Sequence, residues 1–238
     1  MSPRTIIANG QWIFSGQTYH VPDGRYAQNC VIENGGRIVV DSNGETRRTI
    51  VDLGGELTIL AGGLDSNATI YGHETVSGGG AVALSATVNG GGIQYVAFGA
   101  VASSTIVNSG GKQVIDTGGF ASGTNVQSNG LQIIENLFNG TMGGIATATA
   151  LNAGATQYVS SGGIASATIV AGLGSQQDVF SGGTANATTL FGTQNLFSGG
   201  VVSGRIVKNG GVQWVSGGVA SATVIEWGGT SLSTVARR

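Results

Sequence analysis

The chain has few of the residues that brace or charge most protein folds. Of its 238 residues, one is cysteine, two are proline, two are histidine and only 9% are charged. The single cysteine, Cys30, excludes an intrachain disulfide, and two histidines are too few for a typical histidine-based metal site. Two prolines exclude collagen, although 44 residues are glycine. We therefore expect no metal and no cofactor.

The shortage of charge also limits the possible partners. The net charge is −2, and residues 117–204 contain no charged side chain except Glu135 and Asp178. Without a basic face, nucleic-acid binding is disfavoured. No apolar run is long enough to span a membrane. Hydrophobic residues still make up 40% of the chain and are mostly small or β-branched, which argues against disorder and favours thin, stacked strands.

A glutamine recurs with a spacing close to nineteen residues, and a fixed period of this size indicates a repeat architecture. The glutamines are Gln94, Gln113, Gln132, Gln157, Gln177, Gln194 and Gln213. Ser231 continues the column forwards, and Glu74, Glu56 and Arg37 continue it backwards. The interval between Gln132 and Gln157 is 25 residues, and the extra residues, within Glu135–Ala148, are expected to bulge from one edge.

Each unit reads as two short extended pieces separated by glycine turns. In Ala165–Val170, alternation places Ala165, Ala167 and Ile169 on the inward face, with Ser166 and Thr168 outward. In the second piece, glutamine shares the inward face with the apolar residue two positions later. Cys30 occupies a slot that later repeats fill with threonine or another small residue.

A buried amide without a partner costs a few kcal/mol, so inward glutamines require a special arrangement. Identical side chains stacked about 4.8 Å apart can hydrogen-bond one another along an axis. This column therefore predicts an all-β, right-handed parallel β-helix with about one turn per 18–20-residue repeat. Residues 1–26 do not match the repeat and are predicted to form an N-terminal cap. Residues 27–238 form one continuous repeat domain, and the C-terminal TSLSTVARR has no comparable cap, which suggests a truncation or a junction with a following segment.

The units resemble the AIDA-type repeats of bacterial autotransporter adhesins. The pattern appears in Asn209–Val224 (NGGVQWVSGGVASATV), with small departures in Asn108–Val126, and it covers about residues 27–236. The resemblance implies a non-catalytic, extracellular passenger at the bacterial cell surface that serves in adhesion, self-association or biofilm formation. Its implied partners are other copies of itself, a host receptor or glycan, and a heptosyltransferase that glycosylates serine and threonine.

Two sets of surface residues are candidates for function. The first set comprises serines at expected exposed turns, stacked in register, which are candidates for O-glycosylation: Ser109, Ser161, Ser181, Ser198 and Ser216. The second comprises outward aromatics that could stack on sugars or on a partner protein: Tyr95, Tyr158 and Trp214. Turn-forming serines and isolated exposed aromatics are the alternative interpretations.

Two other functions remain open at this stage. A carbohydrate-cleaving or carbohydrate-binding β-helix, such as a phage tail-spike-like module, would need clustered acids, and Glu56, Glu74 and Glu135 are the candidates. Arg37 with Glu56 and Glu74 is instead read as a charged continuation of the ladder. Ice binding would need an outward threonine row, and the candidate row is Thr69, Thr87, Thr105, Thr168 and Thr223.

Overall fold

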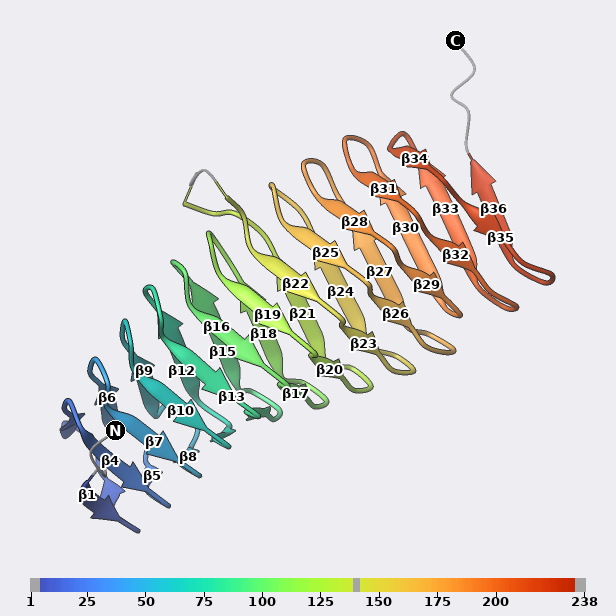
Figure 1. Ribbon diagram of the computed structural model, residues 1–238. Coiled ribbons are helices and arrows are strands. Elements are labelled where there is room, and N and C mark those ends of the chain that lie inside the picture. The colour runs from blue at the N-terminus through green and yellow to red at the C-terminus, as the bar shows by residue number, and fades with distance from the viewer. Residues whose placement is uncertain (1–4, 139–141, 234–238) are drawn as a thin grey trace.

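The computed structural model, which describes residues 5–138 and 142–233, is a parallel β-solenoid of about twelve turns. Figure 1 shows the turns stacked in chain order from one end of the rod to the other. The described strands form three twelve-stranded sheets, and each strand pairs in parallel with the strand three positions further along the chain. The prediction of an all-β parallel β-helix is confirmed. Among the described residues, no helix is long and apolar enough to cross a membrane.

We name the three sheets A, B and C in the order in which the chain enters them. Sheet A contains β1 (Thr5–Asn9), β4 (Arg25–Gln28), β7 (Glu45–Arg47), β10 (Leu64–Ser66), β13 (Val82–Leu84), β16 (Val101–Ser103), β19 (Phe120–Ser122), β22 (Ile145–Thr147), β25 (Ile164–Ser166), β28 (Thr184–Asn186), β31 (Val201–Ser203) and β34 (Val219–Ser221).

Sheet B contains β2 (Trp12–Ile13), β5 (Val31–Ile32), β8 (Ile50–Val51), β11 (Thr69–Ile70), β14 (Thr87–Val88), β17 (Ile106–Val107), β20 (Asn125–Val126), β23 (Ala150–Leu151), β26 (Ile169–Val170), β29 (Thr189–Leu190), β32 (Ile206–Val207) and β35 (Val224–Ile225). Sheet C contains β3 (Thr18–Val21), β6 (Arg37–Val40), β9 (Glu56–Ile59), β12 (His73–Ser77), β15 (Ile93–Ala97), β18 (Lys112–Ile115), β21 (Leu131–Ile134), β24 (Thr156–Val159), β27 (Gln176–Val179), β30 (Thr193–Phe197), β33 (Val212–Ser216) and β36 (Thr230–Ser233).

Each turn therefore has three strands, and the expectation of two extended pieces was wrong. The segment Ala165–Val170 is not one strand, because Ala167 has a positive φ of 53° and forms the corner between sheets A and B. The corner shifts the alternation by one residue. Thr168 is consequently buried and Ile169 exposed, which is the reverse of the expectation.

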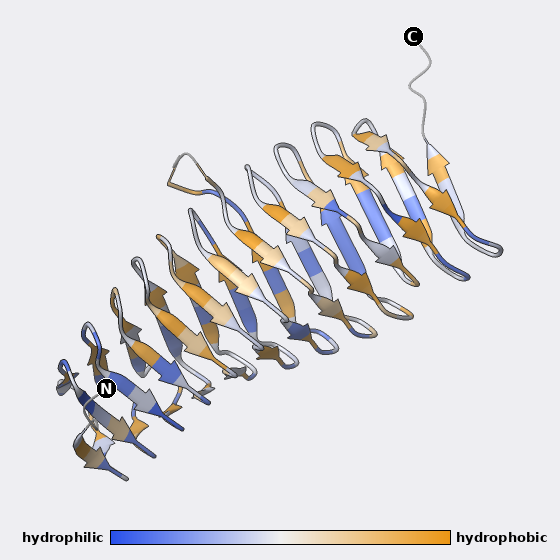
Figure 2. Ribbon diagram, viewed as in Figure 1, coloured by the Kyte–Doolittle hydropathy of each residue, from blue (hydrophilic) through white to orange (hydrophobic). Residues whose placement is uncertain are grey.

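The interior is filled by columns of small and β-branched residues. Sheet A contributes a column of alanines, Ala83, Ala102, Ala121, Ala146, Ala165 and Ala185, all buried. In Figure 2, hydrophobic residues recur in every turn, with hydrophilic residues between them in sheet C. Because these side chains are short, the three sheets can approach closely and fill the interior without a bulky core.

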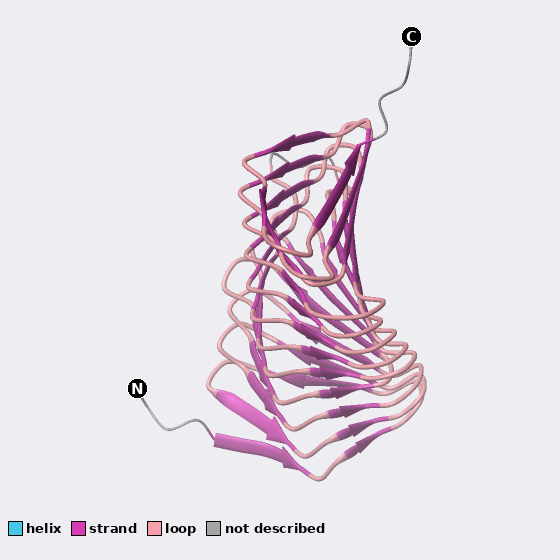
Figure 3. Ribbon diagram, turned by 90° about the vertical axis from the view of Figure 1, so that its right-hand side faces the viewer, coloured by secondary structure: helices cyan, strands magenta, loops and turns pink. Residues whose placement is uncertain are grey.

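Glycines close the corners where the chain passes directly over the preceding turn. Gly119 lies directly before β19 of sheet A, and a Cβ atom there would lie 2.2 Å from the Val96 carbonyl oxygen. Only glycine fits such a contact without moving the backbone. Figure 3 shows these corners as loops stacked along the edges of the rod.

The N-terminal residues form a turn of the solenoid. Strands β1, β2 and β3 are the first strands of sheets A, B and C, and the predicted domain boundary at residue 26 falls inside β4. Residues 5–26 thus form an ordinary three-stranded turn, although their sequence does not match the repeat. A capping role for this turn stays a prediction.

Candidate functional site

The amide ladder runs through the interior along sheet C. All seven glutamines are fully buried, and from Gln113 onward each Nε2 donates to the Oε1 of the glutamine one turn earlier. The N–O distances range from 2.6 Å, as between Gln157 and Gln132, to 2.9 Å between Gln213 and Gln194. Ser231 continues the column, because its Oγ donates to Gln213 Oε1 at 2.9 Å. The ladder is therefore directional, with every amide nitrogen pointing toward the N-terminal end.

A column of buried threonines satisfies the second lone pair of five ladder oxygens. Four of them donate to the glutamine eleven residues earlier, as Thr105 does to Gln94 at 3.0 Å and Thr124 to Gln113 at 2.9 Å, and Thr149 donates to Gln132, seventeen residues earlier. The other donors are Thr168 and Thr188. The expectation of an outward threonine row was wrong for Thr105 and Thr168, which are buried in this column. Cys30 lies in the same slot of an earlier turn, as expected.

The ladder ends on a buried carboxylate pair. Gln94 Nε2 donates to Glu74 Oε2 at 2.7 Å, and Thr46 Oγ1 donates to Asp65 Oδ1 at 2.8 Å. Both acids are fully buried, and the remaining oxygens, Asp65 Oδ2 and Glu74 Oε1, have no hydrogen-bond donor. Burial raises the pKa of Asp65 to about 7. Burial, followed by the charge of Asp65, raises the pKa of Glu74 well above its usual value, which favours a protonated carboxyl in this pair.

Glu56 and Arg37 do not belong to the ladder, contrary to expectation. Strand pairing places Leu57 and Ile38 in the glutamine column, so Glu56 and Arg37 lie one residue away and face outward. There they form an exposed ion pair with Arg37 Nε 3.8 Å from Glu56 Oε2, beside a shallow hollow of about 260 Å³. A one-residue offset reverses the face because side chains alternate along a strand.

The three acids considered for catalysis are not brought together. Glu74 lies inside the rod, Glu56 lies on the outer face of sheet C, and Glu135 follows β21 more than three turns later. Burial, followed by the nearby charge of Asp116, raises the pKa of Glu135. A glycosidase needs two carboxyl groups on either side of one bond, and these three provide no such pair.

The inserted segment after β21 is held by Asp116, a residue that the sequence reading did not single out. Asp116 Oδ1 accepts the backbone N–H of Leu137 at 2.8 Å, and Tyr95 Oη donates to Asp116 Oδ2 at 2.6 Å. Although burial raises the pKa of Asp116, hydrogen bonds from Tyr95 and neighbouring groups lower it overall. Phe138 packs against Phe98 with ring centroids 5.4 Å apart. Residues 139–141 of the predicted bulge lie outside the described residues.

The five candidate serines are all exposed, but they occupy two different corners. Ser161, Ser181 and Ser198 lie between sheets C and A, where Ser161 donates its backbone N–H to the Ser181 carbonyl at 3.1 Å. Ser216 ends β33 and pairs with Phe197. Ser109 lies between sheets B and C, on another edge of the rod. The expectation of one in-register stack was therefore wrong for Ser109 and Ser216.

The three candidate aromatics share one outward column of sheet C. The register runs Tyr95, Val114, Ile133, Tyr158, Asp178, Asn195 and Trp214. Three turns separate each aromatic from the next, about 14 Å at the spacing of stacked strands, so they do not form one platform. Tyr158 instead packs edge-on against Phe180, which stacks on Phe197 at 4.9 Å between centroids.

The comparisons with known proteins agree with this architecture. A family model described as the adhesin of the bacterial autotransporter system, probable stalk, matches residues 15–79. A search of curated proteins gave no match. Among solved structures, the crystal structure of a TibC-catalysed hyper-glycosylated TibA fragment superposes with a TM-score of 0.73 and 29% sequence identity. The alignment covers 98% of this chain and 96% of that fragment.

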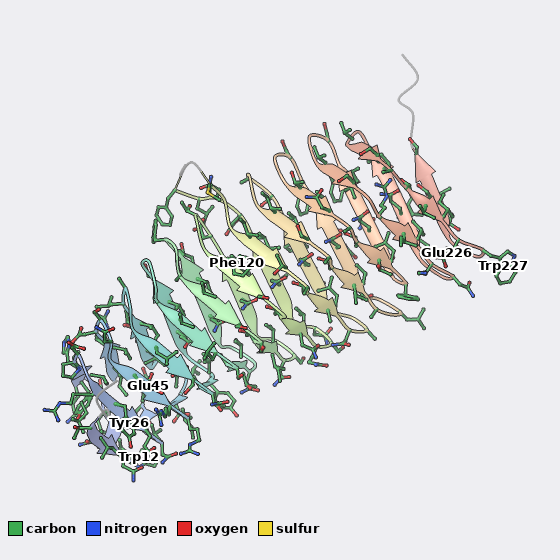
Figure 4. The ribbon with its side chains drawn as sticks, in the orientation of Figure 1. Trp12, Tyr26, Glu45, Phe120, Glu226 and Trp227 are labelled. Carbon is green, nitrogen blue, oxygen red and sulfur yellow. The ribbon has the colours of Figure 1, made fainter. Side chains whose placement is uncertain are left out.

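Both findings agree with the predicted resemblance to the AIDA-type repeats of autotransporter adhesins. The family match begins at residue 15 and therefore includes residues 15–26 of the segment that was expected to be a cap. The charged residues of the chain concentrate before residue 117. Figure 4 shows Trp12, Tyr26 and Glu45 gathered with many other side chains at the N-terminal end.

Proposed function

We propose that this chain is a non-catalytic adhesin stalk at the bacterial cell surface whose corner serines accept O-linked sugars from a glycosyltransferase. The observation that carries the proposal is the match along nearly the whole chain to a TibA fragment that was itself hyper-glycosylated. Ser161, Ser181 and Ser198 are exposed at consecutive turns of one edge. A sugar on each would project into solvent and would leave the inward columns undisturbed.

Glycosylation also offers a physical answer to the shortage of surface charge. Residues 117–204 carry only two charged side chains, and most of the candidate serines lie in this part. Attached sugars would hydrate a surface that otherwise depends on neutral side chains and exposed backbone. We expect modification to increase the solubility of the rod.

Co-expression with a TibC-type heptosyltransferase tests the modification. Intact mass should rise by whole sugar residues, and peptide fragmentation should locate them on the corner serines. A variant with alanine at Ser161, Ser181 and Ser198 should lose most of the added mass. The matched control replaces Ser122, Ser166 and Ser203, which are half-buried at strand ends. Absence of added mass on the parent chain, or equal loss in the control variant, would contradict the proposal.

Adhesion and self-association are the second part of the proposal. Rods with a regular polar edge can align side by side through hydrogen bonds between many equivalent turns, and weak contacts then add. Cells displaying the chain should clump or bind surfaces, whereas cells displaying a chain with reversed charges or scrambled corners should not. Cells that remain dispersed, together with monomeric rods in sedimentation velocity at high concentration, would refute this part.

A further inference from the structure

Two corners between sheets B and C are shorter than those beside them. Two residues form each of them, Tyr71–Gly72 in one and Phe191–Gly192 in the other. The corner one turn before Tyr71–Gly72 has four residues, Asp52–Gly55. In both short corners the two backbone N–H groups donate to a single carbonyl oxygen, of Val51 in one and Val170 in the other. A Cβ at Gly72 would lie 2.3 Å from the Asp52 carbonyl oxygen, so the corner requires glycine.

The first short corner cuts a notch into the edge of the rod. The notch has a volume of about 420 Å³ and is lined by Glu33, Asn34, Asp52, Leu53, Tyr71 and Gly90. Leu53 leans across the short corner, since a Cβ at Gly91 would lie 3.7 Å from Leu53 Cδ1. The notch therefore has an apolar wall, a tyrosine where the corner is short, and carboxylates on the side nearer the N-terminus.

The second short corner, six turns later, has equivalent apolar parts. Leu173 precedes it and is 93% exposed, as Leu53 is 71% exposed in the first. Phe191 and Tyr71 occupy the same position and are 44% and 41% exposed. With Trp227, these two leucines are the most exposed large hydrophobic side chains among the described residues.

The two short corners differ in charge. Glu33 and Asp52 follow paired strands and occupy the same position on successive turns, where stacked backbones are about 4.8 Å apart, so two like charges lie on neighbouring turns. Neither enters the ion pairs found among the described residues, and no basic side chain lines the notch. At the second short corner the corresponding positions are Asn152 and Ala171. Only the first short corner thus has a charge that a ligand would neutralise.

We propose that the notch between Glu33 and Gly90 binds an arginine or lysine side chain from a basic peptide segment of a partner protein. The aliphatic stem of such a side chain fits against Leu53, while the cation lies over the Tyr71 ring and between the carboxylates. This combination of an apolar wall, an aromatic face and unpaired carboxylates matches an amphipathic cation better than an uncharged sugar. The site lies at a different corner from Ser161, Ser181 and Ser198, so it does not depend on their glycosylation.

Titration with acetyl-Gly-Arg-Gly-amide, followed by NMR of the backbone amides, tests the site. Shifts should be confined to Gly72, Gly90, Gly91 and their neighbours. The same peptide with citrulline, the neutral isostere of arginine, should bind about tenfold more weakly, because it loses its charge contacts with both carboxylates. Binding of the arginine peptide should also weaken as salt is added.

Two variants separate the site from general electrostatics. Glu33→Gln with Asp52→Asn should reduce the affinity about tenfold, whereas Asp23→Asn with Asp41→Asn changes the net charge equally and should leave it within about twofold. Matching circular dichroism and urea midpoints establish that all variants are folded. Equal binding of the citrulline peptide, equal loss in both double variants, or shifts that instead follow an uncharged methyl glycoside at Tyr71 would overturn the proposal.

Discussion

Replacing Gln157 with leucine removes one rung from the amide ladder inside the rod. Gln157 Oε1 accepts hydrogen bonds from Gln177 Nε2 at 2.6 Å and from Thr168 Oγ1 at 3.3 Å. Its own Nε2 donates to Gln132 Oε1 at 2.6 Å. Leucine has a similar size and creates little cavity, so the change mainly deletes hydrogen bonds.

The magnitude follows from the donors left without a partner. Gln177 Nε2 and Thr168 Oγ1 lose their acceptor in a fully buried site, at about 1–3 kcal/mol each. Gln132 Oε1 retains the hydroxyl of Thr149 at 3.1 Å, so its loss is smaller. Burying leucine in place of an amide returns about 1–2 kcal/mol. We expect a net loss of about 3 kcal/mol in the free energy of unfolding.

Urea denaturation measures this loss, and hydrogen exchange locates it. In a stacked repeat each turn contacts only its neighbours, so exchange should accelerate most in β24 and β27. Tyr158→Phe is the matched control, since it alters the adjacent outward side chain and should cost less than about 0.5 kcal/mol. A loss below about 1 kcal/mol for Gln157→Leu would refute the reasoning, because it would show that the ladder amides contribute no more than surface contacts do.

Two further predictions concern the buried charges. The pKa values of Asp65 and Glu74 are raised in the folded state, that of Asp65 to about 7, so the pair contributes stability that is present below pH 4 and is lost as the pH rises through about 7. Glu74→Gln should therefore flatten the fall of the urea midpoint between pH 4 and pH 8. A fall as steep as that of the parent chain would contradict this prediction. Arg205 is buried in the threonine column eleven residues after Gln194, its Nε has no partner, and burial lowers its pKa to about 10. Arg205→Thr should therefore stabilise the fold by about 1–3 kcal/mol, because it removes an unpaired buried charge and its new hydroxyl can donate to Gln194. Thermal unfolding tests this prediction, and a lower midpoint than that of the parent chain would disprove it.

Much of the architecture was predictable because the repeated side chains contact the equivalent side chains of neighbouring turns. Seven glutamines at a nearly constant spacing indicate in-register parallel stacking, since an inward amide is tolerable only if each one finds the next. The same argument led to the parallel β-helix. The Ser-Gly-Gly motif predicted exposed serines at the corners, because serine and glycine favour turns.

The errors arose where one backbone conformation changed the phase of the pattern. Ala167 adopts a positive φ that alanine rarely takes, so nothing in its identity signals a corner. Without that corner, Thr168 and Ile169 were assigned to the wrong faces. In the same way, Glu56 was placed in the ladder although Leu57 occupies that position.

Periodicity alone therefore determined the fold class, the stacking direction and the inward glutamine column, because each depends on neighbours at one fixed distance along the chain. The tertiary structure decided which residues meet across the rod. Asp65 in sheet A and Glu74 in sheet C form a pair only because the solenoid brings different sheets face to face. The notch beside Tyr71 likewise depends on corner length relative to the turns above and below, a comparison that exists only once the turns are stacked.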